Sequence, residues 1–335
     1  MTRGRGNLIN KNLIFQLIYT LILVCACTQV HAQQPSGMDS GVDGKDKLYR
    51  ILVKNVGLTK DKKIVSYVNK VADKIVIASK SPLTYKETLV VNTPEIIALT
   101  NFHYVFLSTG LIALLSDEAE LAAVISHEIA HIASDHKTKL KNLVHKLLDY
   151  QEQYNEAGYD KFASDLSKTY VLLEIRRNRR QFEKSADQTA LNFLLSGNYN
   201  PYAYISALKK LELIIDNTFS KKNEQNKIIS DLLSTHPPIK NRMKNVNQLL
   251  DSYNAYPLNS RGYKERFMAN IDGMTLFSGS TGSVPAKYII RYVRSASLKK
   301  LNKDDELLEY ILLINQANSL KSLADKERIK RVYIK

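Results

Sequence analysis

Two histidines and a glutamate stand close together in the segment His127-Glu128-Ile129-Ala130-His131. Helix periodicity places residues four apart on one face, so both imidazoles could reach the same metal ion. Glu128 lies about 100° around the helix from His127, out of line with the histidines but within reach of a metal-bound water. Such a pattern is typical of zinc peptidases, in which the glutamate is the general base. The alternative is a pair of surface histidines at helical spacing.

A catalytic zinc needs a third protein ligand, because such a site holds three and keeps water in the fourth position. The best candidate is Glu183, which lies 52 residues after His131 in Phe182-Glu183-Lys184-Ser185-Ala186-Asp187. Asp187 follows one turn later, where its carboxylate could accept the second N–H of a ligand histidine. By spacing alone this pair is weak evidence, because a Glu and an Asp one turn apart on a helix usually face solvent.

These two motifs together resemble those of the gluzincin metallopeptidases of the HtpX, BepA, Oma and CAAX-prenyl-protease type. Two further segments are similar. Residues 234–238, Ser-Thr-His-Pro-Pro, with Arg242 resemble the family's His-Pro-Pro…Arg signature. Residues 267–273 resemble a segment that follows the catalytic domain in periplasmic members. The resemblance covers about residues 46–273 and points to the soluble periplasmic branch.

The resemblance implies a site and a reaction. One Zn²⁺ per chain would be bound by His127, His131 and Glu183, with Glu128 as the base and Asp187 hydrogen-bonded to a ligand histidine. The implied reaction is hydrolysis of internal peptide bonds in polypeptide substrates, and the implied setting is protein quality control in the bacterial envelope. The competing hypothesis is a non-catalytic or self-inhibited zinc-binding protein with a chaperone-like role.

His236 is expected near the metal by the same resemblance. It could stabilise the oxyanion, bind zinc as a fourth ligand at rest, or be a structural histidine in a tight proline turn. Arg242 could orient an acid or cap a helix, and no catalytic role is assigned to it. His136 is off the predicted ligand face, and we expect it and His145 to be solvated.

One segment departs from the family pattern. Members usually carry Asn-Ala-Phe before a glycine-rich edge strand ahead of the zinc helix, whereas residues 101–106 here read Asn-Phe-His-Tyr-Val-Phe. We still expect an edge strand in this segment, able to pair with substrate backbone.

The first 32 residues read as a secretory signal peptide. Three basic residues precede an apolar stretch from Leu13 to Val24, and Val30-His31-Ala32 suits a signal peptidase. We therefore expect secretion across the inner membrane and a periplasmic location. An uncleaved anchor is one alternative. Another is a lipid anchor on Cys27, because residues 24–27 loosely resemble a lipobox.

The charge of the chain narrows the classes of partner. Its formal net charge is +15, and removal of residues 1–32 takes away three basic residues and no acidic ones. A basic mature chain favours an envelope membrane or an acidic partner, such as one in outer-membrane assembly. Nucleic acid is not expected, because the basic residues are spread out and no aromatic-basic motif stands out. The sequence leaves the oligomeric state open.

The predicted fold is α+β: a mostly helical zincin-type metallopeptidase domain with a small β-sheet beside the zinc helix. A linker at 33–45 precedes the zinc metallopeptidase domain at 46–252, and a C-terminal extension at 253–335 ends in a basic helical tail. β-like runs are expected at Glu87–Val91 and Tyr104–Ser108. The zinc helix is expected from a Ser116 cap to about His136, followed by a helical hairpin over 137–180 and a separate helix over 181–195.

Overall fold

The structure is a computed structural model. It describes residues 52–81, 83–156, 161–219, 239–253, 261–281, 284–294, 311–312, 314–317, 322, 326 and 328–334. The expected signal peptide, the linker, Cys27 and His236 lie outside the described residues.

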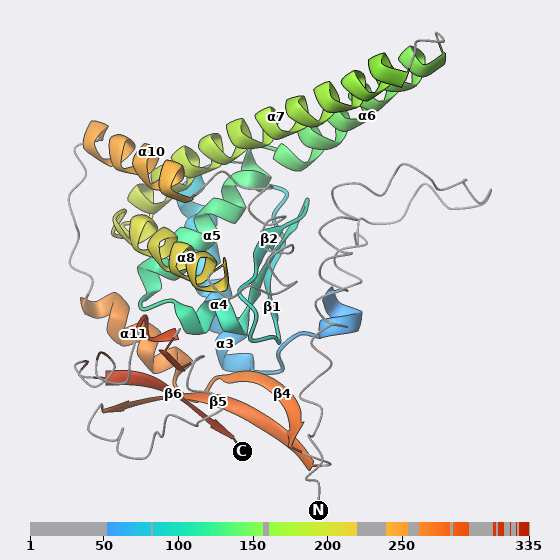
Figure 1. Cartoon of the computed structure of the whole chain (residues 1–335). Helices are drawn as coiled ribbons and strands as arrows, with labels where there is room; N and C mark the ends of the chain where they lie inside the picture. Colours follow the sequence, from blue (N-terminus) through green and yellow to red (C-terminus); the bar gives the residue numbers. More distant parts are fainter. Residues whose placement is uncertain are drawn as a thin grey trace, which may run out of the picture.

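A three-stranded sheet lies beside the helix that carries the two histidines (Figure 1). The strands are β1 (Glu87–Val91), β2 (Ala98–Thr100) and β3 (Tyr104–Ser108), in the order β1-β3-β2. The central strand β3 is parallel to β1, antiparallel to β2 and buried along its whole length. Helix α3 (Lys62–Ser79) joins the same core, and a short π-helix, η1 (Leu52–Val56), packs at β1. The mostly helical α+β fold predicted from the sequence is confirmed.

The edge strand is not where the sequence predicted it. Residues 101–103 form the turn between β2 and β3, because the Asn101 side-chain oxygen accepts the backbone N–H groups of His103 (2.9 Å) and Tyr104 (2.7 Å). Tyr104 and Phe106 therefore belong to the central strand. Of the two outer strands, β2 is the one that passes close to α5, the helix that carries the two histidines, in Figure 1.

The zinc helix is α5 (Glu118–Ala133), reached from β3 through the short helix α4 (Thr109–Leu114). Its N-cap is Asp117, whose carboxylate accepts the Glu120 N–H at 2.8 Å, so the predicted Ser116 cap is wrong by one residue. α5 also ends earlier than expected. Asp135 adopts a left-handed φ of 49°, which turns the chain sharply before the next helix starts at His136.

Two long helices form an antiparallel hairpin that projects from the body (Figure 1). They are α6 (His136–Glu156) and α7 (Lys161–Ser196). The prediction of a separate helix from residue 181 is wrong: no proline or glycine interrupts residues 161–196, so α7 runs through. Among the described helices, none combines the length and the apolarity needed to cross a bilayer. Helix α8 (Ala203–Phe219) packs against α5, and α10 (Ile239–Ser252) packs against both α8 and α7.

The C-terminal extension differs most from the prediction. After α11 (Arg261–Ile271), the described residues form a second antiparallel sheet of β4 (Thr275–Thr281), β5 (Val284–Arg294) and β6 (Arg328–Ile334), in the order β4-β5-β6. A helical tail is therefore wrong for residues 284–294 and 328–334. In β5, burial alternates, with Tyr288 and Ile290 inside and Lys287 outside, which is a strand period.

This second sheet packs against the same core as the zinc helix. The Thr109 hydroxyl donates to the Leu276 carbonyl of β4. The fully buried Lys330 of β6 donates to the carbonyls of Ala113, Leu115 and Ile314. Hydrogen bonds thus connect the C-terminal extension to α4, the short helix that precedes α5 in the chain.

Candidate metal centre

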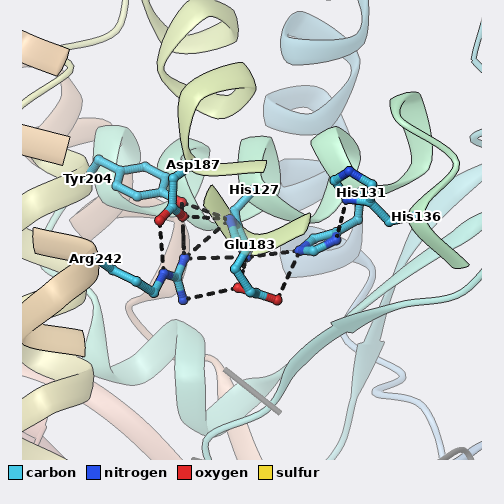
Figure 2. Close-up of polar contacts among 7 residues, drawn as sticks. All are labelled: His127, His131, His136, Glu183, Asp187, Tyr204 and Arg242. Carbon is cyan, nitrogen blue, oxygen red and sulfur yellow. Dashed lines mark hydrogen bonds and ion pairs between the residues drawn. The ribbon is translucent and has the colours of Figure 1, made fainter. Parts of the chain in front are cut away.

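Five helices contribute the residues drawn in Figure 2. α5 supplies His127 and His131, and α7 supplies Glu183 and Asp187. These elements pack closely because α5 is almost entirely buried and faces the base of α7. The structure therefore brings together the two motifs that stand 52 residues apart in the sequence.

Three candidate ligand groups, two imidazoles and one carboxylate, lie at the spacing expected around a tetrahedral ion. Nε2 of His127 is 3.2 Å from Nε2 of His131 and 3.3 Å from Oε2 of Glu183. Nε2 of His131 is 3.5 Å from the other oxygen, Oε1, of Glu183. With zinc bonds of about 2.0–2.2 Å, the edge of a ligand tetrahedron is about 3.3–3.6 Å. The donor set and its spacing both fit zinc.

The far side of the His127 ring is held by a carboxylate and a hydroxyl. Nδ1 is 3.2 Å from Oδ1 of Asp187 and 2.8 Å from the hydroxyl of Tyr204 on α8. A proton on Nδ1 leaves Nε2 with its lone pair toward the other ligand atoms. Asp187 thus occupies the place predicted for it. Tyr204 was not singled out, because a tyrosine on an amphipathic helix gives no sequence signal of this kind.

Arg242, on α10, forms ion pairs with the carboxylates of both Asp187 and Glu183. Its Nη2 is 2.6 Å from Oδ1 of Asp187 and its Nε is 3.1 Å from Oδ2, a bidentate pair, while Nη1 is 3.6 Å from Glu183. Burial alone would raise the pKa of Asp187, but Arg242 and His127 outweigh it and hold this pKa well below its ordinary value. Arg242 therefore orients an acid, one of the two roles open for it from the sequence.

The pKa of His127 affects how readily the site binds a metal ion. Burial and the Arg242 guanidinium lower the pKa of His127, but hydrogen bonds with Asp187 and Glu183 outweigh them and raise it to about 9. A metal must displace that proton, so loading is expected to release protons and to weaken in acid.

His136 is not solvated, contrary to the sequence prediction. It is 6% exposed, its Nδ1 lies 3.0 Å from Nδ1 of His131, and its ring stacks on Phe182 at 4.7 Å. Burial, with Lys139 nearby, lowers its pKa to about 4. The turn at Asp135 brings α6 back against the end of α5, which helical spacing alone could not reveal. His145, farther along α6, is exposed as expected.

Glu128 is buried, at 6% exposure, in the same turn of α5 as the ligand histidine before it. Helix geometry sets its side chain about 100° from His127, so it is not one of the three converging ligand atoms. As a buried glutamate one residue after a candidate ligand, it suits the role of proton acceptor.

Comparison with known proteins gives two matches. The family model for peptidase family M48 matches residues 59–250, more than half of the chain. The chain is also similar to the mitochondrial metalloendopeptidase OMA1 of Arabidopsis thaliana, with 30% identity over 162 residues. That alignment covers 47% of this chain and 30% of the relative's length. The family match includes α5, most of α10 and every candidate ligand.

Proposed function

The chain belongs to peptidase family M48, and from that premise we propose that it is a zinc-dependent endopeptidase. One observation carries the proposal: two imidazole nitrogens and the Glu183 carboxylate converge at separations of 3.2, 3.3 and 3.5 Å, as on the edges of a zinc tetrahedron. Three protein ligands leave one position for water, which is the arrangement of a catalytic rather than a structural zinc site.

The proposal gives each residue of the site a role. Held by His127, His131 and Glu183, the ion would supply Lewis-acid chemistry at the water and the scissile carbonyl. Glu128 accepts the proton of the attacking water and returns it to the leaving amine. The carboxylate of Asp187 and the hydroxyl of Tyr204 keep the proton of His127 on Nδ1, which reserves Nε2 for the metal.

The proposed substrate is an extended polypeptide segment. Within the described residues, β2 pairs only with β3, and it passes beside α5 (Figure 1). An extended peptide could add to that edge by backbone hydrogen bonds and so lie across the metal position. We therefore propose that the substrate pairs with Ala98–Thr100 rather than with residues 101–106.

His236 enters the proposal through the same family pattern. If it stabilises the oxyanion, His236→Ala should lower the rate by about 10²-fold and leave zinc in place. If it binds zinc at rest, the same change should open the fourth position to water and raise activity. We favour the resting ligand, which would keep the enzyme self-inhibited. A casein assay of wild type and variant at equal zinc occupancy separates these readings, and no change would leave a structural histidine.

The cellular setting is also proposed. Quality control of polypeptides in the bacterial periplasm fits a secreted endopeptidase, with an envelope membrane or an outer-membrane assembly partner for the basic chain. Nucleic acid is not proposed as a partner. Mass spectrometry of the mature N-terminus separates two routes of processing. A start at Gln33 indicates cleavage by signal peptidase, and a lipid on Cys27 indicates an anchor.

Metal analysis and casein digestion test the proposed function together. The purified chain should hold about one zinc, lose casein hydrolysis after chelation, and regain it when zinc is restored. His127→Ala should lose zinc, whereas His145→Ala, which removes an exposed histidine of α6, should not. Hydrolysis that survives complete removal of metal would refute the proposal, as would a chain that binds no metal.

A further inference from the structure

The structure assigns a role to His136, which the proposed chemistry does not use. We propose that His136 is a positioning residue for the metal ligand His131, acting as the neutral acceptor of a hydrogen bond from the His131 ring. This inference rests on the proposed function, because it takes His131 to be a zinc ligand.

The first step is the placement of one proton. The two Nδ1 atoms are 3.0 Å apart, so one must donate and the other accept. Nε2 of His131 is the atom that faces His127 and Glu183, at 3.2 and 3.5 Å, and a metal ligand needs a lone pair there. A neutral imidazole carries one N–H, so His131 must carry it on Nδ1. His136 is then the acceptor at Nδ1.

The second step is why His136 stays in place. It is the first residue of α6, immediately after the left-handed turn at Asp135 (φ 49°). Its ring stacks on Phe182 at 4.7 Å and 21°, and meets the His131 ring edge-on at 5.0 Å and 75°. Phe182 directly precedes Glu183 on α7, so one helix supplies both a proposed ligand and the ring that packs against His136.

The third step is the difference between the two ligand histidines, visible in Figure 2. The outer nitrogen of His127 faces Asp187, Tyr204 and, at 3.3 Å, the guanidinium of Arg242, whereas that of His131 faces an imidazole. The carboxylate can draw the proton of its ring and add negative charge, but the imidazole can only orient its partner. His136 therefore fixes the direction of the His131 lone pair without adding charge to the site.

Zinc affinity of the full chain, measured by competition with a chelator, tests the inference. His136→Leu removes the acceptor and keeps apolar bulk against Phe182, and should weaken zinc binding about 10- to 100-fold. His136→Asn places a side-chain oxygen close to the original Nδ1 and should recover most of that loss. The matched control is His145→Leu, which removes an exposed histidine from the same helix and should leave the zinc affinity unchanged.

A second readout locates the proton directly. In ¹⁵N spectra of the zinc-loaded protein, His131 should carry hydrogen on Nδ1. A proton on its Nε2 would overturn the inference. So would wild-type zinc affinity in His136→Leu, and so would equal losses in the Leu and Asn variants, which would mean that ring packing alone matters. If wild type binds zinc and His136→Leu binds it equally well, only this inference fails; if wild type binds none, the proposed function fails as well.

Discussion

The buried pair of Arg242 and Asp187 gives the sharpest prediction for stability. Their exposed fractions are 7% and 1%, and the pair is bidentate, with N–O distances of 2.6 and 3.1 Å. Arg242→Met keeps much of the side-chain volume but removes the bidentate arginine from the buried Asp187 carboxylate, which retains only the Tyr204 hydroxyl and the His127 ring as partners. Breaking a buried pair from one side costs about 3–5 kcal/mol. The metal-free chain should therefore unfold at a clearly lower urea concentration.

A second arginine of the same chain supplies the matched control. Arg266 also makes a bidentate pair with a buried carboxylate, Glu118, at 3.0 and 2.9 Å, but its own side chain is 54% exposed. Two tyrosine hydroxyls also donate to Glu118 and remain after the change. Arg266→Met should thus cost about 1 kcal/mol or less.

Urea unfolding of both arginine variants, with chelator present, measures the difference in stability between the two losses. Adding Asp187→Asn to Arg242→Met should recover part of the loss, because the buried charge disappears with its partner. The reasoning is refuted if Arg242→Met unfolds like wild type. It is equally refuted if the two arginine variants lose the same stability.

Three further predictions concern the metal, the C-terminal sheet and alkaline pH. Glu183→Ala should lower zinc content and casein hydrolysis together, since two histidines hold zinc poorly; tight stoichiometric zinc would mean another ligand. Lys330→Met should cost about 2–4 kcal/mol in urea unfolding, because three backbone carbonyls lose their donor, whereas Lys287→Met on the exposed face of β5 should cost little. Burial, with the charge of Glu118, raises the pKa of Tyr67 above its ordinary value of 10. The contribution of the protonated Tyr67 hydroxyl to the free energy of unfolding is present below pH 10. It is lost as the pH rises further, because this tyrosine ionises at a lower pH in the unfolded chain than in the folded one. From pH 10 to 11, wild type should lose up to about 1 kcal/mol more stability than Tyr67→Phe, and equal losses would contradict this.

Local signals in the sequence predicted the elements closest to the chemistry. The β-branched and aromatic runs marked the strands Glu87–Val91 and Tyr104–Ser108 with the bounds that the structure has. Helical spacing placed the two histidines on one face of α5, and the helix predicted over 181–195 ends within one residue of the end of α7 at Ser196. Each of these features depends on residues that are close together in the chain, so local sequence patterns were enough to predict it.

Features made by distant contacts were missed or misplaced. His136 looked solvated because its burial depends on the Asp135 turn and on Phe182, which comes from another helix. Strand β6 is held in place by Lys330, a residue type that a sequence reading normally assigns to the surface. The sequence predicted the edge strand at residues 101–106, whereas the outer strand beside α5 is β2. Strand order depends on pairing between distant residues, which no local pattern indicates.

The central claim is that Glu128 is the general base of a zinc-dependent peptide hydrolysis. The most direct test is casein hydrolysis by wild type and Glu128→Gln at equal, measured zinc occupancy. The amide cannot accept the proton and is not a ligand in this site, so zinc content should be unchanged and the rate should fall at least about 10²-fold. Near-normal hydrolysis by Glu128→Gln with its zinc in place would contradict the account.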